Sequence, residues 1–197
     1  MADLTKKPKP EKETLSFTDY KKWNAWLSKN HNKSDGIWLR FYKKESGIRS
    51  INHEQALDEA LCFGWIDGQA LKYDDQSWLQ KFTPRRARSI WSKRNADRSE
   101  ELINLKRMNP AGVIEINRAK EDGRWKSAYD SPVNMTIPED FLQELSKNQT
   151  TLRFFDSLNK SNKYAITWRL QTAVKPEIRK KRMTQILEML SKGEKFH

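Results

Sequence analysis

The sequence predicts an α+β protein: an N-terminal domain of helices and antiparallel sheet, followed by a small all-helical C-terminal domain. The two-residue period of β-strands is confined to residues 37–83, whereas helical periodicity alone continues from residue 92 onward. Eight Trp, eight Phe and five Tyr supply large apolar side chains for a folded core. We expect domains at residues 15–130 and 131–197, after a flexible Lys- and Pro-rich arm at residues 1–14.

Local signals place the elements of the N-terminal domain. Helices are expected at residues 16–30, 52–63, 92–107 and 110–122, and strands at residues 37–42, 65–72 and 77–83. Ser16 with Asp19, and Asn52 with Gln55, have the spacing of capping boxes. Aromatic residues on both faces of the first strand favour a central place in the sheet. The last two strands should form an antiparallel hairpin that Pro84 terminates.

The C-terminal domain should follow a linker at residues 131–134 and contain four helices. Pro138, Thr150, Ser161 and Pro176 mark their starts, and the last helix should run to Lys192. This domain contains no strand-like segment.

Composition limits the classes of function. The net charge is +12, with twelve basic and six acidic residues in 1–50 and eleven and four in 151–197. No run approaches the roughly 18 apolar residues of a membrane span, and residues 1–13 lack an apolar signal segment. We therefore expect a cytoplasmic protein without membrane insertion.

No cofactor or metal site is expected, and no catalytic residue can be assigned. Cys62 is the single cysteine, and its place near a helix C-terminus favours a buried packing role over a nucleophilic one. The three histidines, His31, His53 and His197, lack metal-ligand spacing. Phosphate-loop, dinucleotide and nucleophile-elbow motifs are missing.

Asp67 is the one acidic residue on a predicted strand in otherwise apolar company, two residues after Trp65, and both are candidate ligand residues. It is either a general base or ligand hydrogen-bond acceptor, or a structural partner of Arg85 or Arg86 across the hairpin. The ion pair is the favoured interpretation, because a buried carboxylate needs a cation.

Residues 81–94 interleave cations with aromatic rings and include no acid. Guanidinium groups bind phosphate or carboxylate and stack on indoles, which suits an anionic ligand carrying a flat ring. The alternative is a solvated arm that pairs with acids at 97–101 and 54–59. The candidate ligand residues of this stretch are Arg85, Arg86, Arg88, Trp91 and Arg94.

The last helix carries two arginines on its apolar stripe. With Ile186 at the centre of a helical wheel, Arg179 and Arg182 lie at about +20° and −40°, while Lys180 and Lys181 turn outward. An inward arginine must be compensated, either by a protein acid or by a bound anion. Both arginines are therefore candidate ligand residues.

Several blocks of the sequence resemble a known family. Residues 158–161 (Leu-Asn-Lys-Ser), 164–173 (Tyr-Ala-Ile-Thr-Trp-Arg-Leu-Gln-Thr-Ala) and 175–182 resemble the C-terminal domain of the YdeI/OmpD-associated family. Residues 36–41, 54–68, with their Cys-Phe-Gly-Trp-Ile-Asp-Gly core, and 78–95 resemble its longer members. Val174 and Ile178 depart from the family pattern. The resemblance implies a bacterial stress-response setting of protection against bacteriocins and antimicrobial peptides, and it supplies no catalytic residue.

Three hypotheses of function follow. The leading one is a stress- or antimicrobial-resistance-associated protein that binds an anionic small molecule or acidic partner through an Arg- and Trp-lined surface between its two domains. The second is an enzyme on a small anionic substrate with Asp67 as acid or base and arginines as a clamp, which requires a second titratable group beside Asp67 in a closed pocket. The third is nonspecific nucleic-acid binding through the basic patches.

Overall fold

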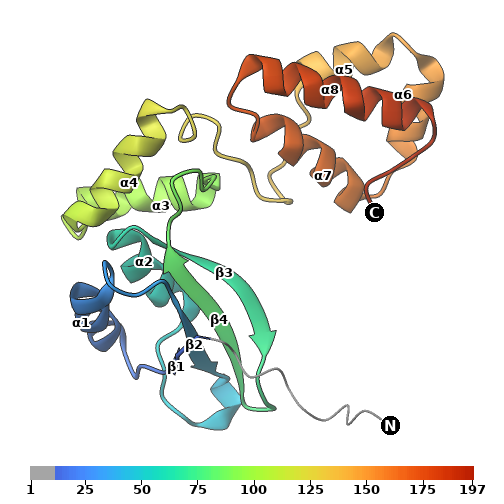
Figure 1. Ribbon diagram of the computed structural model, residues 1–197. Helices are drawn as coiled ribbons and strands as arrows, with labels where there is room; N and C mark the ends of the chain where they lie inside the picture. The colour runs from blue at the N-terminus through green and yellow to red at the C-terminus, as the bar shows by residue number, and fades with distance from the viewer. Residues whose placement is uncertain (1–11) are drawn as a thin grey trace. The chain divides into compact units, whose positions relative to one another are not determined.

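The computed structural model describes residues 12–197, which fold into a four-stranded sheet and eight α-helices (Figure 1). The strands are β1 (Thr14–Leu15), β2 (Ile37–Tyr42), β3 (Trp65–Lys72) and β4 (Ser77–Pro84). The helices are α1 (Tyr20–Asn30), α2 (His53–Cys62), α3 (Lys93–Asn104), α4 (Pro110–Glu121), α5 (Glu139–Ser146), α6 (Gln149–Ser157), α7 (Lys160–Gln171) and α8 (Pro176–Ser191). The predicted α+β class is confirmed.

These elements belong to two compact units. The N-terminal unit runs to Ser89 and includes Ser99–Ile116, and the C-terminal unit consists of Ile90–Arg98 and Asn117–His197. The division falls within α3 and α4. The domain boundary expected at residue 130 stays a prediction.

The sheet of the N-terminal unit has the order β1-β2-β4-β3. Its β3–β4 hairpin and the internal position of β2 agree with the sequence patterns, and β4 ends at Pro84 as expected. The short parallel strand β1 was not predicted, and it begins at the last residue of the expected arm. Residues 1–11 of that arm lie outside the described residues.

Helices α1 and α2 both cover the sheet face that carries Phe82. Trp23 of α1 and His53 of α2 contact its ring at centroid distances of 5.8 and 6.4 Å. The predicted Ser16 cap is wrong: Asp19 is the N-cap and its carboxylate accepts from the Lys22 N–H, because α1 begins only at Tyr20. The capping box of α2 is confirmed in both directions.

Bulky aromatic side chains form the core between α1 and the sheet. The indole of Trp23 packs on Trp26, Trp65 and Phe82 at centroid distances of 5.3, 6.3 and 5.8 Å. Both Trp23 and Trp65 are fully buried, and their ring N–H groups donate to the carbonyls of Ala56 and His31. Each indole thereby keeps its polar atom paired inside an apolar cluster.

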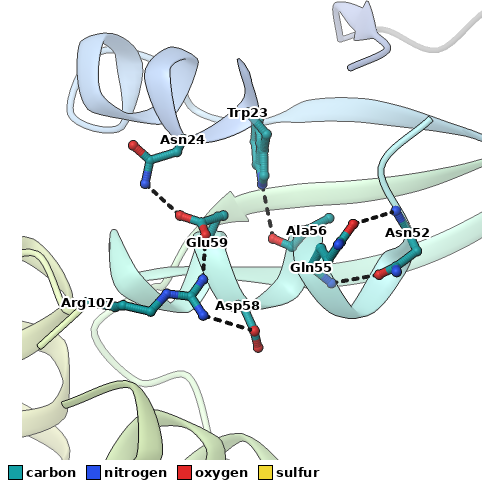
Figure 2. A network of polar contacts seen from close by, with 8 residues as sticks. All are labelled: Trp23, Asn24, Asn52, Gln55, Ala56, Asp58, Glu59 and Arg107. Carbon is teal, nitrogen blue, oxygen red and sulfur yellow. Dashed lines mark hydrogen bonds and ion pairs between the residues drawn. The ribbon is translucent and has the colours of Figure 1, made fainter. Parts of the chain in front are cut away.

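A buried polar network joins α1, α2 and the segment before α4 (Figure 2). Glu59 is 3 % exposed and accepts hydrogen bonds of 2.6 Å from both Asn24 and Arg107. Asp58, 6 % exposed, lies 3.7 Å from the same guanidinium. Arg107 therefore compensates the buried carboxylate of Glu59, whose burial without a cation would be costly, and it also lies near Asp58.

The four helices α5–α8 enclose a separate apolar core in the C-terminal unit. Its members come from all four helices: Phe141, Leu145, Phe155, Leu158, Ile166, Leu170, Ile186 and Leu190. The four-helix prediction is confirmed, and each start falls within one residue of its predicted position. Cys62, in the N-terminal unit, is the last residue of α2 and is buried, as the packing interpretation predicted.

Removing Arg107 should strongly destabilise the N-terminal unit. We expect Arg107→Met to lower the free energy of unfolding by about 2–4 kcal/mol, because the buried carboxylate of Glu59 loses its cation. Lys106→Met is the matched control, since Lys106 is adjacent, exposed and outside any ion pair of the described residues. Denaturant titration measures both, and equal losses would contradict the role of the network.

Candidate functional site

The predicted ligand residues are distributed over both units. Trp65, Asp67, Arg85, Arg86 and Arg88 belong to the N-terminal unit. The C-terminal unit holds the other four, Trp91, Arg94, Arg179 and Arg182. A shared surface between the domains therefore stays a prediction, and each group is described within its own unit.

Three of the candidate ligand residues in 65–94 are buried within the protein. Trp65 is a core residue, as described above, and Trp91 is 1 % exposed with its ring 4.8 Å from that of Trp125. Arg85 is 8 % exposed, and its backbone N–H donates to the Gly64 carbonyl.

The remaining cations of that stretch lie at the surface. Arg86 and Arg88 are exposed in the turn after β4, and Arg94 is exposed in the first turn of α3. Exposed single cations of this kind are compatible with solvated side chains, so a ligand surface that they share with the two buried indoles stays a prediction.

Asp67 pairs with a histidine, so the predicted ion pair with Arg85 or Arg86 is wrong. Its Oδ2 lies 3.1 Å from His53 Nε2. The cross-strand neighbour of Asp67 is Phe82, so the arginines lie beyond the end of the hairpin pairing, after Pro84. The enzyme hypothesis required a second titratable group beside Asp67 in a closed pocket. His53 is such a group, whereas the closed pocket around Asp67 stays a prediction.

The phase predicted for α8 agrees with the structure. Ile186 and Leu190 are buried, Arg179 and Arg182 are half-buried, and Lys180 and Lys181 are exposed. The two arginines, however, have different partners.

Arg179 is compensated by a protein acid. Its Nη2 lies 2.8 Å from Asp140 Oδ1, at the start of α5. The carboxylate of Asp140 is 55 % exposed, so this ion pair is screened by solvent and contributes little to stability. The charge of Arg179 is therefore compensated without a ligand, although its Nη1 is buried without a hydrogen-bond partner.

Arg182 has no carboxylate partner among the described residues. Its Nη1 donates to the Arg169 carbonyl at 2.7 Å and to the Thr172 hydroxyl at 3.2 Å, at the C-terminal end of α7. A cation there is favourable beside the negative end of the helix dipole. Both bonds use Nη1, which leaves Nε and Nη2 without partners in residues 12–197.

Arg169 lies next to it and likewise has no acid partner in the described part of the chain. Its guanidinium stacks on Phe196 at 3.7 Å from the ring centroid, and Nη1 donates to the Ala165 carbonyl at 2.9 Å. Burial and, second, the positive charge of Arg182 lower the pKa of Arg169. The two residues are neighbours, since Arg182 also bonds the Arg169 carbonyl, and like charges placed close together repel.

Both guanidinium groups open onto one hollow of about 530 Å³ in the C-terminal unit. Trp168, Met189 and Phe196 form apolar parts of its wall. Glu188 and Glu194 also line it, but neither forms an ion pair with either arginine. Two half-buried cations that repel each other, in a hollow of ligand size, form a candidate site for an anion.

Neither a cluster of metal ligands nor a membrane-spanning helix is present in the described residues. No group of three or more His, Cys, Asp or Glu side chains in residues 12–197 has the arrangement of a metal site. No helix in that range is long and apolar enough to cross a membrane.

Comparison with known families identifies the chain. A family model described as Domain of unknown function (DUF8412) matches residues 15–115, about half of the chain. The chain belongs to this family. A second model, Bacteriocin-protection, YdeI or OmpD-Associated, matches residues 134–193 and confirms the resemblance noted in the sequence. Neither curated proteins nor solved structures gave a match.

The match to the second model covers α5–α8 and hence both Arg169 and Arg182. Sequence reasoning found Arg182 but missed Arg169, because no helical wheel was applied to α7. Ala165, Ile166 and Leu170 form the buried face of that helix, and Arg169 lies beside it. The same wheel argument would have found it.

The Arg179–Asp140 pair should behave as an ordinary surface interaction. In a double-mutant cycle of Arg179→Gln and Asp140→Asn we expect a coupling of about 1 kcal/mol or less, because Asp140 faces solvent. Lys180→Gln is the control and should change the unfolding free energy less than Arg179→Gln does. Equal losses from both substitutions would mean that α8 is phased differently.

Proposed function

We propose that this DUF8412 family member acts in bacteriocin protection by binding a small anion between the guanidinium groups of Arg169 and Arg182. One observation carries the proposal: the two half-buried cations share a hollow and lack a carboxylate partner among the described residues. The setting comes from the match of residues 134–193 to the bacteriocin-protection family.

The energetic argument concerns the cost of placing like charges together. Both guanidinium groups are half-buried neighbours of like charge, so without a counter-ion their arrangement is electrostatically unfavourable. An anion held by both would relieve the repulsion and form charge-assisted hydrogen bonds with the Nε and Nη2 groups of Arg182. The stacked ring of Phe196 restrains Arg169, which reduces the entropy lost on binding.

The lining of the hollow favours phosphate or carboxylate anions. A planar guanidinium matches the geometry of these groups and binds them in a bidentate manner. Trp168 and Phe196 add apolar surface that favours an organic anion over a bare ion. Glu188 and Glu194 disfavour highly charged ligands, because they add negative charge to the same wall.

The cellular setting is part of the same proposal. The chain has a single cysteine, and Cys62 is buried without a disulfide. This pattern fits a reducing compartment, so we propose that the protein works in the cytoplasm.

The site can be tested by ligand-induced stabilisation with inorganic phosphate and with an organic phosphate. A ligand that binds only the folded state raises the melting temperature, by about 5–10 °C for a chain of this size at 100 times Kd. We expect Arg169→Gln and Arg182→Gln each to abolish the shift. Neither should unfold the protein, because each removes one of two repelling charges.

Lys181→Gln is the matched control, since Lys181 is the exposed neighbour of Arg182 on α8 and carries the same charge. It should retain the full shift. Equal loss of stabilisation in Lys181→Gln and Arg182→Gln would contradict the site and indicate attraction by net charge. A short oligonucleotide that binds with a steep dependence on salt, equally in all variants, would instead favour the nucleic-acid hypothesis.

A further inference from the structure

A second hollow, of about 460 Å³, lies in the N-terminal unit at the end of β2. Its wall includes Phe41, the loop of residues 43–52 and His53 at the start of α2. The ring of Trp78 stacks on that of Phe41, with centroids 4.6 Å apart and planes 18° from parallel, and both rings line the hollow. The hollow therefore contains a flat aromatic surface.

A histidine held by a carboxylate stands beside this aromatic surface. His53 Nε2 lies 3.1 Å from Asp67 Oδ2, and the imidazole ring is 6.0 Å from Trp78 and 6.1 Å from Phe41. Asp67 does not itself line the hollow. The bond to Asp67 is the one hydrogen bond of the His53 ring to residues 12–197, so Nδ1 remains able to bond a ligand.

The charge of the hollow is positive. Lys43, Lys44 and Arg49 line it, and none forms an ion pair with a described residue. Glu45 lies in the same loop but does not line the hollow. Three uncompensated cations, a histidine and stacked rings together match an anion that carries a flat ring.

We propose that this hollow is a second ligand site, which binds a small anion bearing a planar ring, of the nucleoside monophosphate class. The planar ring stacks on Trp78, the anionic group pairs with the loop cations, and His53 hydrogen bonds to the ligand. Asp67 is a positioning residue that fixes the orientation of the imidazole. The site is independent of Arg169 and Arg182.

Nuclear magnetic resonance of the full chain tests the site, because the sequence has three histidines and their ring signals are easily distinguished. Adenosine monophosphate is the probe, with adenosine and inorganic phosphate as its uncharged and ringless counterparts. We expect the monophosphate to shift the His53 signals saturably, and each counterpart to bind at least tenfold more weakly. Equal binding of phosphate alone, or shifts at His31 and His197 but not His53, would overturn the proposal.

Variants of His53 and Asp67 test whether Asp67 acts by orienting the imidazole of His53. His53→Gln and Asp67→Asn should each weaken binding of adenosine monophosphate, and the double variant should be no weaker than His53→Gln, because Asp67 acts through His53. Asp75→Asn is the control on the same hairpin, since Asp75 is exposed, and it should bind as the parent does. Additive losses from His53→Gln and Asp67→Asn would overturn the positioning role.

Arg182→Gln should leave adenosine monophosphate binding at His53 unchanged. Loss of the His53 shift in that variant would overturn the independence of the two sites. If the His53 signals still shift with adenosine monophosphate while phosphate no longer raises the melting temperature, the independence of the two sites is supported.

Discussion

A buried or half-buried charge must be compensated, and this requirement determines how the arginines of both units are paired. In the N-terminal unit, Arg107 compensates Glu59, and through that contact the segment before α4 is fixed to α2. In the C-terminal unit, Arg179 has Asp140, whereas Arg182 has only backbone and hydroxyl acceptors. The same physical requirement thus separates arginines whose charge a protein acid compensates from arginines that remain available for a ligand.

The two proposed sites share one physical feature. At each, a group that is restrained by its neighbours keeps part of its hydrogen-bonding capacity: Arg169 is stacked on Phe196, and His53 is held by Asp67. Restraint reduces the entropy lost on binding, and a local excess of positive charge favours anions. The sites lie in different units, and each is complete within its own unit.

Much of the fold could be predicted from local sequence signals, and less of the site. Capping residues, prolines and the two periodicities located every helix and the β3–β4 hairpin, because these signals act over a few residues. β1 was missed, since two residues carry no periodicity. The Asp67–His53 pair was missed because the two residues are brought together by packing of α2 on the sheet, which no local pattern encodes. The phase of α8 was predictable, but whether each inward arginine meets an acid was not.

The central claim is that Arg182 and Arg169, and not the other cations of the helical unit, bind the anion. The arginine Nε–H signals in a nitrogen-15 spectrum report each guanidinium separately during titration with phosphate. The account predicts saturable shifts at Arg169 and Arg182, with Arg179 unchanged because Asp140 already compensates it. Shifts of similar size at all three arginines, without saturation, would contradict it.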